Sequence, residues 1–266
     1  MSQPPTEATE LQHTDIVGPS DGRPIVFVHG AMFTRAMWAP QRDALADEFR
    51  VIVPDLPGHG GRSSEPFDFE RSLTILETLL EKETDGKAVL VGLSLGGYLV
   101  TEYASRHPEQ VDGLVVIGAS ANPVRGMNLL TRLTGGVARL VTRSDRLEGL
   151  IERLGYRWVK NRDLSPATKA EIIDAGLYPR SFGTPGPALA GRNFRAMLAS
   201  YPGPTLLING ENDAIMRRGA SDHAEAGIDV TTVVVSGVGH VCTLHAPEAV
   251  TDVIREFVSE LDDSGS

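Results

Sequence analysis

The sequence has a single cysteine, no long hydrophobic run and no recognisable targeting segment. Cys242 is the only cysteine among 266 residues, which excludes an intramolecular disulfide and any zinc or iron–sulfur site with several cysteine ligands. No apolar run is long enough to cross a bilayer, so no membrane span is expected. The first 15 residues lack a basic stretch followed by an apolar one, so no secretory signal is expected either. A cytoplasmic protein is the prediction.

Positive charge is also scarce. The chain has 25 lysines and arginines against 35 aspartates and glutamates, a formal net charge of −10. Nucleic acid and anionic membranes would be repelled overall, so a small neutral molecule is the expected ligand. The protein is expected to be a monomer or a homodimer. Hydrophobic residues make up 41% of the chain, an ordinary share for a globular protein. The length suffices for one large α/β domain with an inserted subdomain.

Short apolar runs alternate with longer segments of helical period. The runs are rich in Val and Ile without polar alternation, which is typical of strands covered on both faces of a mainly parallel sheet. The predicted strands lie near residues 24–30, 50–55, 88–94, 113–120, 205–210 and 230–237. The predicted helices lie near residues 38–48, 69–83, 95–106, 217–226 and 247–260. This alternation predicts an α/β fold with a doubly wound sheet, although no strand is recognisable before residue 23.

One long interval between two predicted strands has no strand pattern of its own. It contains amphipathic pieces separated by Gly and Pro, with Leu, Ile and Trp at helical spacing that favours burial. These pieces lie at residues 129–141, 146–159, 167–177 and 191–200. We therefore predict a helical cap at residues 122–204, inserted into a core domain formed by residues 1–121 and 205–266.

Ser94 lies in a glycine-rich stretch, VGLSLGG, between a predicted strand and a predicted helix. Gly92 stands two residues before it and Gly96 two residues after it. A nucleophile elbow holds its serine in a strained backbone conformation, and small neighbours keep the turn clear of the adjoining strand and helix. The pattern predicts a nucleophilic serine at a helix start, where the amide of Leu95 points at a developing oxyanion.

A serine nucleophile needs a base and a group that orients this base. His240 directly follows the last predicted strand, in VVVSGVGH, and a parallel sheet brings its carboxyl edge beside Ser94. Asp213 follows the preceding strand, in LLINGENDAI, and Glu211 in the same turn is the alternative acid. The order Ser94, Asp213, His240 is the order expected for a triad on a doubly wound sheet.

The other histidines and the cysteine have simpler interpretations. Three histidines are expected at the surface: His13, His107 and His223. His29 and His59, in loops after the first two predicted strands, are expected to shape these loops. His245 is the nearby alternative to His240, and we expect it to cap or pack at the terminal helix. Cys242, without an elbow around it, is expected to be a buried small residue.

Five motifs are distributed over most of the chain, each occurring once: VHGAMF, DLPGHGGRS, GLSLGG, GENDAI and GVGH. Together they resemble the motifs of the α/β-hydrolase family, in its capped, esterase-like branch. The resemblance implies Ser94 as the nucleophile, Asp213 as the acid, His240 as the general base and a cap that selects the substrate. One departure is His245, which stands where relatives often carry an acidic residue.

The resemblance implies hydrolysis of a carboxylic ester or lactone of a small, largely apolar molecule through an acyl-enzyme on Ser94. It implies an oxyanion hole formed by the amides of Leu95 and Ala31, with Met32 as the second possibility beside Ala31. No metal and no organic cofactor is implied. The apolar candidates for the pocket wall are Met32, Phe33, Leu95, Trp158, Tyr178 and Phe182.

Other functions stay open on the same scaffold. A serine at the elbow argues against the haloalkane dehalogenase and epoxide hydrolase branches, which carry aspartate there. A C–C bond hydrolase, a hydroxynitrile lyase or a perhydrolase keeps the Ser-His-Asp set, although alanine at position 31, where perhydrolases often have tryptophan, disfavours the last. A ligand receptor with slow hydrolysis is an alternative of another class, and it would stall after about one equivalent of product.

Overall fold

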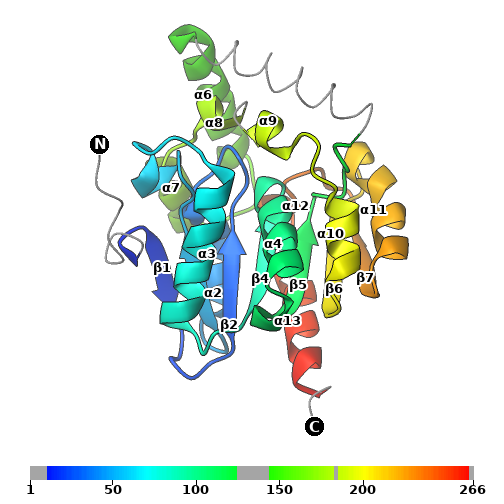
Figure 1. Cartoon of the computed structure of the whole chain (residues 1–266). Coiled ribbons are helices and arrows are strands. Elements are labelled where there is room, and N and C mark those ends of the chain that lie inside the picture. The colour runs from blue at the N-terminus through cyan, green and yellow to red at the C-terminus, as the bar shows by residue number, and fades with distance from the viewer. Residues whose placement is uncertain (1–10, 125–143, 183–184, 264–266) are drawn as a thin grey trace, which may run out of the picture.

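A computed structural model describes residues 11–124, 144–182 and 185–263. Its centre is a seven-stranded sheet in the order β1-β3-β2-β4-β5-β6-β7 (Figure 1). The strands are β1 (Thr14–Val17), β2 (Pro24–Val28), β3 (Arg50–Pro54), β4 (Ala88–Leu93), β5 (Val111–Ile117), β6 (Pro204–Gly210) and β7 (Asp229–Val235). β1 pairs antiparallel with β3, and the other neighbouring strands in this sheet pair in parallel. The predicted α/β class and the six predicted strands are confirmed.

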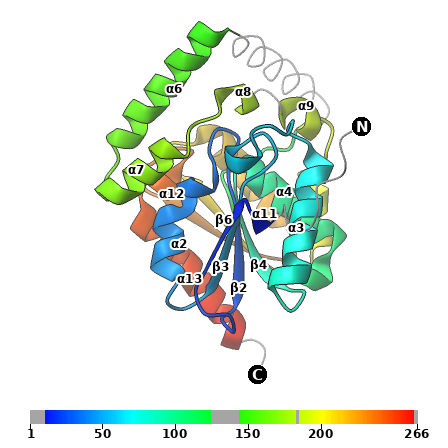
Figure 2. The same cartoon turned by 90° about the vertical axis from the view of Figure 1, so that its left-hand side faces the viewer.

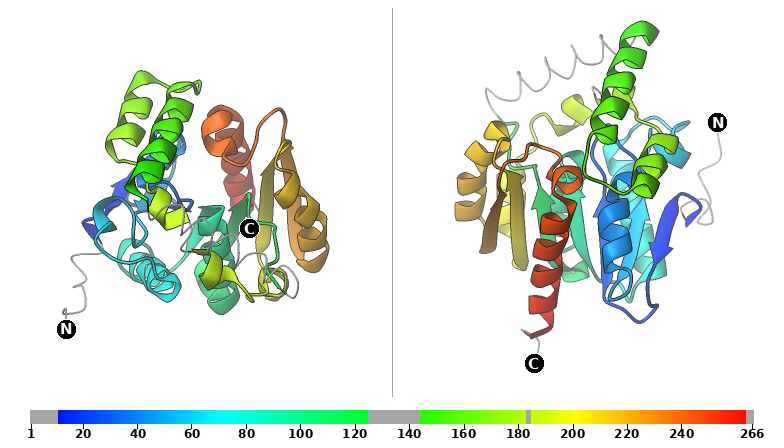
Figure 3. Two further views of the ribbon diagram at one scale, coloured as in Figure 1. Left: turned by 90° about the horizontal axis from the view of Figure 1, so that it is seen from above. Right: turned by 180° about the vertical axis from the view of Figure 1, so that it is seen from behind.

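Helices cover both faces of the sheet (Figures 1 and 3). On one face lie α2 (Ala39–Leu45) and α13 (Pro247–Asp263), and on the other α3 (Phe69–Glu83), α4 (Leu95–Arg106) and α10 (Phe194–Ser200). Successive strand residues point to opposite faces, so each strand divides its side chains between two cores. Ile25 and Phe27 join the core beneath α2 and α13, whereas Val26 and Val28 join the core beneath α3 and α4. Burial on both faces explains the unbroken apolar runs.

The described residues between β5 and β6 form helices and no strand. These helices are α6 (Asp145–Lys160), α7 (Pro166–Asp174), α8 (Pro179–Phe182), α9 (Pro185–Leu189) and α10. In two perpendicular views, α6, α8 and α9 lie above the end of the sheet toward which β2 and β4 run (Figures 1 and 2). The predicted helical piece at residues 129–141 lies outside the described part of the chain, and the boundaries of the cap stay a prediction.

Two contacts show how this helical segment meets the sheet layers. Arg42 of α2 donates to both carboxylate oxygens of Glu171 on α7, at 2.6 and 3.0 Å. α10 packs along α4 on one face of the sheet, and its Phe194 and Leu198 are buried in the core beneath α3 and α4. α10 thus packs as a sheet-covering helix, whereas α6, α8 and α9 lie above the end of the sheet.

Two features differ from the sequence analysis. β1 lies before residue 23, and it lacks the strand pattern because it is a short, half-buried edge strand. The prediction of a surface position for His223 is wrong, since only 3% of this residue is exposed. A Cβ on Gly219 would lie 1.9 Å from the carbonyl oxygen of Ser120, so α11 (Ala214–Ala226) approaches closely and buries His223.

Candidate active site

Ser94 occupies the turn between β4 and α4 in a backbone conformation that residues other than glycine rarely adopt. Its φ of 53° and ψ of −112° make it the one non-glycine residue with positive φ in the described residues. A Cβ on Gly92 would lie 2.3 Å from the backbone of Gly96, and a Cβ on Gly96 would lie 2.1 Å from the carbonyl oxygen of Val28. The turn therefore requires glycine at both positions that the sequence pattern singled out.

The helix that starts after Ser94 presents backbone donors beside its hydroxyl. The Ser94 side chain makes no capping bond to α4, so its oxygen is not used to satisfy the helix. The first intrahelical bond runs from the amide of Tyr98 to the Ser94 carbonyl, at 3.1 Å. The amide of Leu95 precedes this bond and has no partner within the helix. It also lies at the positive end of the helix dipole, where an anion is stabilised.

His240 and Asp213 form a hydrogen-bonded pair. Nδ1 of His240 lies 2.5 Å from Oδ2 of Asp213, whose side chain is 9% exposed. The amide of Met216 donates to the other oxygen of Asp213 at 3.4 Å, which anchors the carboxylate at the start of α11. Glu211 instead accepts from the amide of Gly237 at 2.7 Å and is exposed. The structure thus joins Asp213 to His240, and it gives the alternative acid a different partner.

Ser94 and His240 meet the same end of β5. The amide of Ser94 donates to the carbonyl of Ile117 at 2.8 Å, and the next residue, Gly118, has a φ of +57°. A Cβ on Gly118 would lie 3.2 Å from Nδ1 and Cε1 of the His240 ring. Because Nδ1 is bonded to the acid, Nε2 is the nitrogen that remains for a serine proton. Gly118 was not predicted as part of the site, and its signal in the sequence is a glycine at the end of the run LVVIG.

The loop after β2 reaches Ser94 from the side of β4 opposite β5. A Cβ on Gly30 would lie 3.7 Å from the Cβ of Ser94. The Gly30 carbonyl accepts from Nδ1 of His29 at 2.9 Å and from the amide of Phe33 at 3.2 Å. The carbonyl and N–H of a trans peptide point in opposite directions, so these bonds set the direction of the Ala31 amide. The peptide of Ala31 is thus held next to the serine.

Two buried histidines shape this loop and the next, as the sequence analysis predicts. Nε2 of His29 accepts from the amide of Leu56 at 3.0 Å, so its proton is on Nδ1. His59 places Nε2 2.8 Å from the carbonyl oxygen of Ala31 and Nδ1 3.0 Å from that of Pro57. Burial lowers the pKa of both imidazoles below the ordinary histidine value. Both rings are therefore structural and neutral at physiological pH.

The loop that contains His59 is held by a buried carboxylate. Asp55 is fully buried and accepts from the amides of Arg35 and Gly61, each at 2.9 Å, and from the Arg35 guanidinium. A Cβ on Gly60 would lie 2.1 Å from this carboxylate, so the loop closes tightly around it. The charge of Asp55 is used in this ion pair and in the backbone of the turn.

The remaining reactive side chains near His240 have no such partners. Cys242 is fully buried, and burial raises the pKa of its thiol to about 12, which confirms it as a small buried residue. His245 is exposed and ends the short helix α12 (Cys242–His245), whereas the terminal helix α13 begins at Pro247. Partial burial and the nearby charge of Arg162 lower the pKa of His245. Neither residue has the acid partner that His240 has.

The predicted pocket residues include a link between the cap and the loop after β2. The carbonyl of Met32 accepts from the amide of Tyr178 at 2.9 Å. The Tyr178 ring lies 5.8 Å from the His59 ring, and Phe33 packs against the core beneath α2 and α13. The residues before α8 therefore contact the loop that approaches the serine.

Two of the remaining predicted pocket residues lie on helices of the segment between β5 and β6. Trp158 of α6 is half-buried against the core beneath α2 and α13, and the Arg162 guanidinium lies 4.7 Å from its ring centre. Phe182 ends α8, and its side chain lies outside the described part of the structure. The composition of the pocket wall stays a prediction.

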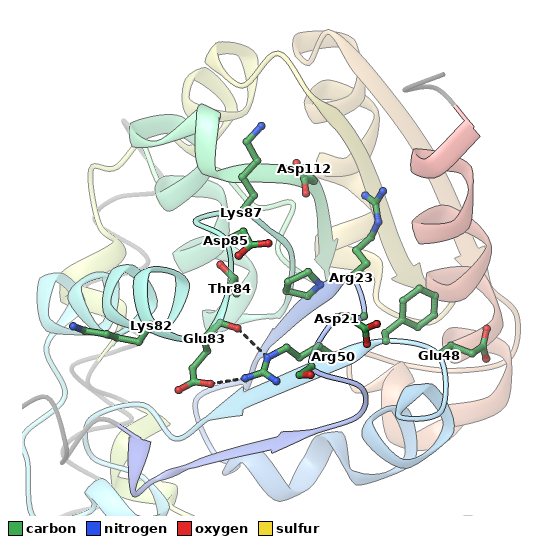
Figure 4. A pocket seen from close by; sticks show the side chains of 14 residues that line it. Asp21, Arg23, Glu48, Arg50, Lys82, Glu83, Thr84, Asp85, Lys87 and Asp112 are labelled. Atoms are coloured by element: carbon green, nitrogen blue, oxygen red, sulfur yellow. Dashed lines mark hydrogen bonds and ion pairs between the residues drawn. The ribbon is translucent and has the colours of Figure 1, made fainter.

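A separate hollow of 750 Å³ lies at the opposite edge of the sheet, where β2 and β3 begin (Figure 4). Arg50 at its floor donates to the carbonyl and the carboxylate of Glu83, at 2.9 and 2.6 Å. Its wall carries side chains of both charges, among them Asp21, Arg23, Glu48, Lys82, Asp85, Lys87 and Asp112. Parallel strands begin at one edge and end at the other, so this hollow is remote from Ser94.

The described residues 11–124, 144–182 and 185–263 offer neither a metal site nor a membrane-spanning helix. No group of three or more His, Cys, Asp and Glu side chains there is arranged to hold a metal ion. No helix there is both long and apolar enough to cross a membrane.

The fold and this site define a class of protein. The model of the alpha/beta hydrolase family matches residues 25–253, which include the Ser94 turn, the Asp213 turn and His240. The chain belongs to the alpha/beta hydrolase family and is a hydrolase.

Individual relatives are esterases. The chain is 28% identical over 265 residues to a pimeloyl-[acyl-carrier protein] methyl ester esterase of Nitrosospira multiformis, covering 88% of this chain and 94% of that protein. It is 26% identical over 272 residues to a carboxylesterase of Bacillus subtilis, covering 94% and 86%. Among solved structures, a thermophilic esterase from Thermogutta terrifontis superposes with a TM-score of 0.76 at 27% identity, covering 93% of each chain.

Proposed function

We propose that this protein is a serine hydrolase that cleaves a carboxylic ester or lactone of a small, largely apolar molecule. The observation that carries the proposal is the His240–Asp213 hydrogen bond at the end of the sheet where Ser94 is held in its strained turn. This is the arrangement that activates a serine hydroxyl at neutral pH.

The proposed reaction has two halves. The Ser94 oxygen attacks the carbonyl carbon while Nε2 of His240 takes its proton, and Asp213 stabilises the resulting imidazolium. The tetrahedral intermediate collapses to an acyl-enzyme, and His240 gives its proton to the departing alcohol oxygen. Water then attacks the acyl carbon with His240 again as base, which releases the acid and restores the Ser94 hydroxyl. In a lactone, the alcohol and acid are parts of one molecule.

Two backbone amides would bind the negative oxygen of the intermediate. One is the amide of Leu95, which has no partner within its helix. The other is the amide of Ala31, with Met32 as the second possibility, on the loop that lies against Ser94. Loss of one such donor typically lowers kcat by about 10²–10³.

The relatives support ester cleavage over the other reactions of this scaffold. Both curated relatives described above are esterases by name, and they cover most of this chain. The helical segment at residues 122–204 would select the substrate, with Met32, Phe33, Trp158, Tyr178 and Phe182 as the proposed wall. We expect catalysis without metal or organic cofactor, in a cytoplasmic monomer or homodimer.

The test begins with turnover by the purified protein on p-nitrophenyl esters of increasing acyl length and on lactones. We expect continued turnover over many equivalents, labelling of Ser94 by a fluorophosphonate probe and loss of activity in Ser94→Ala. Full esterase turnover by Ser94→Ala, or a burst that stops at one equivalent, would refute the proposal.

A matched pair of variants tests the acid. Asp213→Asn removes the charge that orients His240, and we expect kcat to fall on the order of 10⁴-fold. Glu211→Gln changes the neighbouring carboxylate, which accepts from the backbone amide of Gly237 in the loop after β7, and we expect kcat within about threefold of the wild type. Equal effects of the two substitutions would contradict the assignment of Asp213.

A further inference from the structure

Three successive peptides after His29 are each held at the carbonyl. The Gly30 carbonyl accepts from His29 Nδ1, the Ala31 carbonyl lies 2.8 Å from His59 Nε2, and the Met32 carbonyl accepts from the amide of Tyr178. A trans peptide is planar, so a bond at its carbonyl also fixes the direction of its N–H. The peptides on both sides of Ala31 are thus fixed, one by each histidine.

Of these three bonds, the bond from His59 is the one whose donor is a side chain of the neighbouring loop. His59 is fully buried and lies in edge-to-face contact with His29, at 4.9 Å between ring centres. Its two nitrogens face two carbonyl oxygens, and a neutral imidazole has one N–H to give. Burial lowers the pKa of His59, so the ring is neutral and can donate to only one of the two carbonyl oxygens. The Ala31 contact is the shorter of the two and joins residues 28 positions apart.

We propose that His59 is a positioning residue for the oxyanion-binding loop: its Nε2–H donates to the Ala31 carbonyl, which fixes the peptide that carries the Met32 amide and holds the loop that presents the amides of Ala31 and Met32 to the reacting oxygen. His59 touches no substrate in this role and acts through the backbone of the loop. The inference rests on the serine hydrolase function proposed above. It assigns to the second histidine-containing motif, DLPGHGGRS, a part in the chemistry of the first, VHGAMF.

Two substitutions separate the two bonds of the ring. Glutamine places its amide nitrogen near the position of Nε2, so His59→Gln keeps a donor for the Ala31 carbonyl. Asparagine places its amide nitrogen near the position of Nδ1, so His59→Asn keeps a donor for the Pro57 carbonyl and loses the bond to Ala31. Both variants remove the same titratable ring, so each is the control of the other for the loss of the imidazole. Asparagine is one methylene shorter than glutamine, so the thermal midpoint of each variant is measured beside its kcat.

The expected result is a separation in kcat. Oxyanion contacts are made in the tetrahedral stage, so their misplacement lowers kcat and leaves KM nearly unchanged. We expect His59→Asn to lose about 10- to 100-fold in kcat, less than deletion of a donor, with KM within about threefold. His59→Gln is expected to keep kcat within about threefold and to have a similar thermal midpoint. Equal kcat in the two variants, or the lower kcat in His59→Gln, would overturn the proposal.

A measurement on the wild-type protein needs no variant to fold. The ¹⁵N chemical shifts of the His59 ring at pH 7.5 report which nitrogen carries the proton, and the proposal requires the proton on Nε2. A proton on Nδ1 would overturn it. If the wild-type protein itself lacked esterase activity, or Ser94→Ala kept it, the proposed function would fail first, and the two failures are therefore distinguishable.

Discussion

Replacement of Gly96 by alanine would test how closely the serine turn packs against β2. A Cβ at this position would lie 2.1 Å from the carbonyl oxygen and 2.7 Å from the carbonyl carbon of Val28, and 2.9 Å from the carbonyl oxygen of His29. All three contacts are backbone atoms, which cannot rotate away as a side chain does. Ordinary contact requires a separation larger by roughly 1 Å, so α4 and the end of β2 must move apart.

This displacement has a cost in stability and a larger cost in activity. Overpacking of a dense interior typically costs about 1–3 kcal/mol, which for a chain of this length lowers the thermal midpoint by about 2–6 °C. The displaced residues lead directly into the loop of Ala31 and carry the Leu95 amide, so the two proposed oxyanion donors move relative to each other. A misplacement of about 1 Å in such a site can lower the rate by about 10².

The assay compares kcat on the best p-nitrophenyl ester with the midpoint of thermal unfolding. Gly149→Ala is the control, because Gly149 lies in exposed helix α6 and a Cβ there meets no atom within 4 Å. We expect Gly149→Ala to gain about 0.5–1 kcal/mol of helix stability and to keep its activity. A Gly96→Ala protein with wild-type kcat and midpoint would refute the reasoning from this contact.

Two further predictions concern pH and the cap. Burial lowers the pKa of His29, His59 and His223 below the ordinary 6.5, so below about pH 6.5 the unfolded chain binds protons that the native protein does not. The free energy of unfolding should be constant above pH 6.5 and should decrease below that pH by about 1.4 kcal/mol per pH unit for each such histidine. A free energy of unfolding, measured with urea, that stays constant down to about pH 5 would contradict this. The bidentate bond between Arg42 and Glu171 joins α2 to α7, and the side chain of Glu171 is 36% exposed. A double-mutant cycle with Arg42→Met and Glu171→Gln should therefore give a coupling energy of about 0.5–1 kcal/mol, which decreases at 1 M salt. A coupling of zero would show that this pair does not stabilise the cap.

Elements with strong local patterns were predictable from the sequence almost to the residue. The helices predicted at residues 69–83 and 95–106 have these bounds in the structure. The side chain of Asp68 caps the first, and Ser94 of the elbow directly precedes the second. The Ser94 turn and the acid–base pair were predictable as positions, because parallel strands deliver the residues that follow them to one edge. The chemistry assigned to these positions stays a prediction.

Features that depend on contacts between distant segments left no such pattern. β1 is too short and too exposed to show an apolar run, and its pairing with β3 arises only in the assembled sheet. His223 lies in a polar stretch, SDHAEA, and is buried because Gly219 lets α11 approach the chain after β5. The bond of His59 to Ala31 spans 28 residues, and the sequence predicts a loop-shaping histidine there but not its partner.

The strained backbone of Ser94 has a consequence for how this protein can change under selection. A non-glycine residue at this φ and ψ stores about 1–3 kcal/mol, and Ser94→Gly would release much of it at once. Under the proposed mechanism this variant is inactive, and it would then be the more stable protein. Selection for thermal stability alone would therefore favour variants that lack Ser94, whereas selection for turnover would retain the serine.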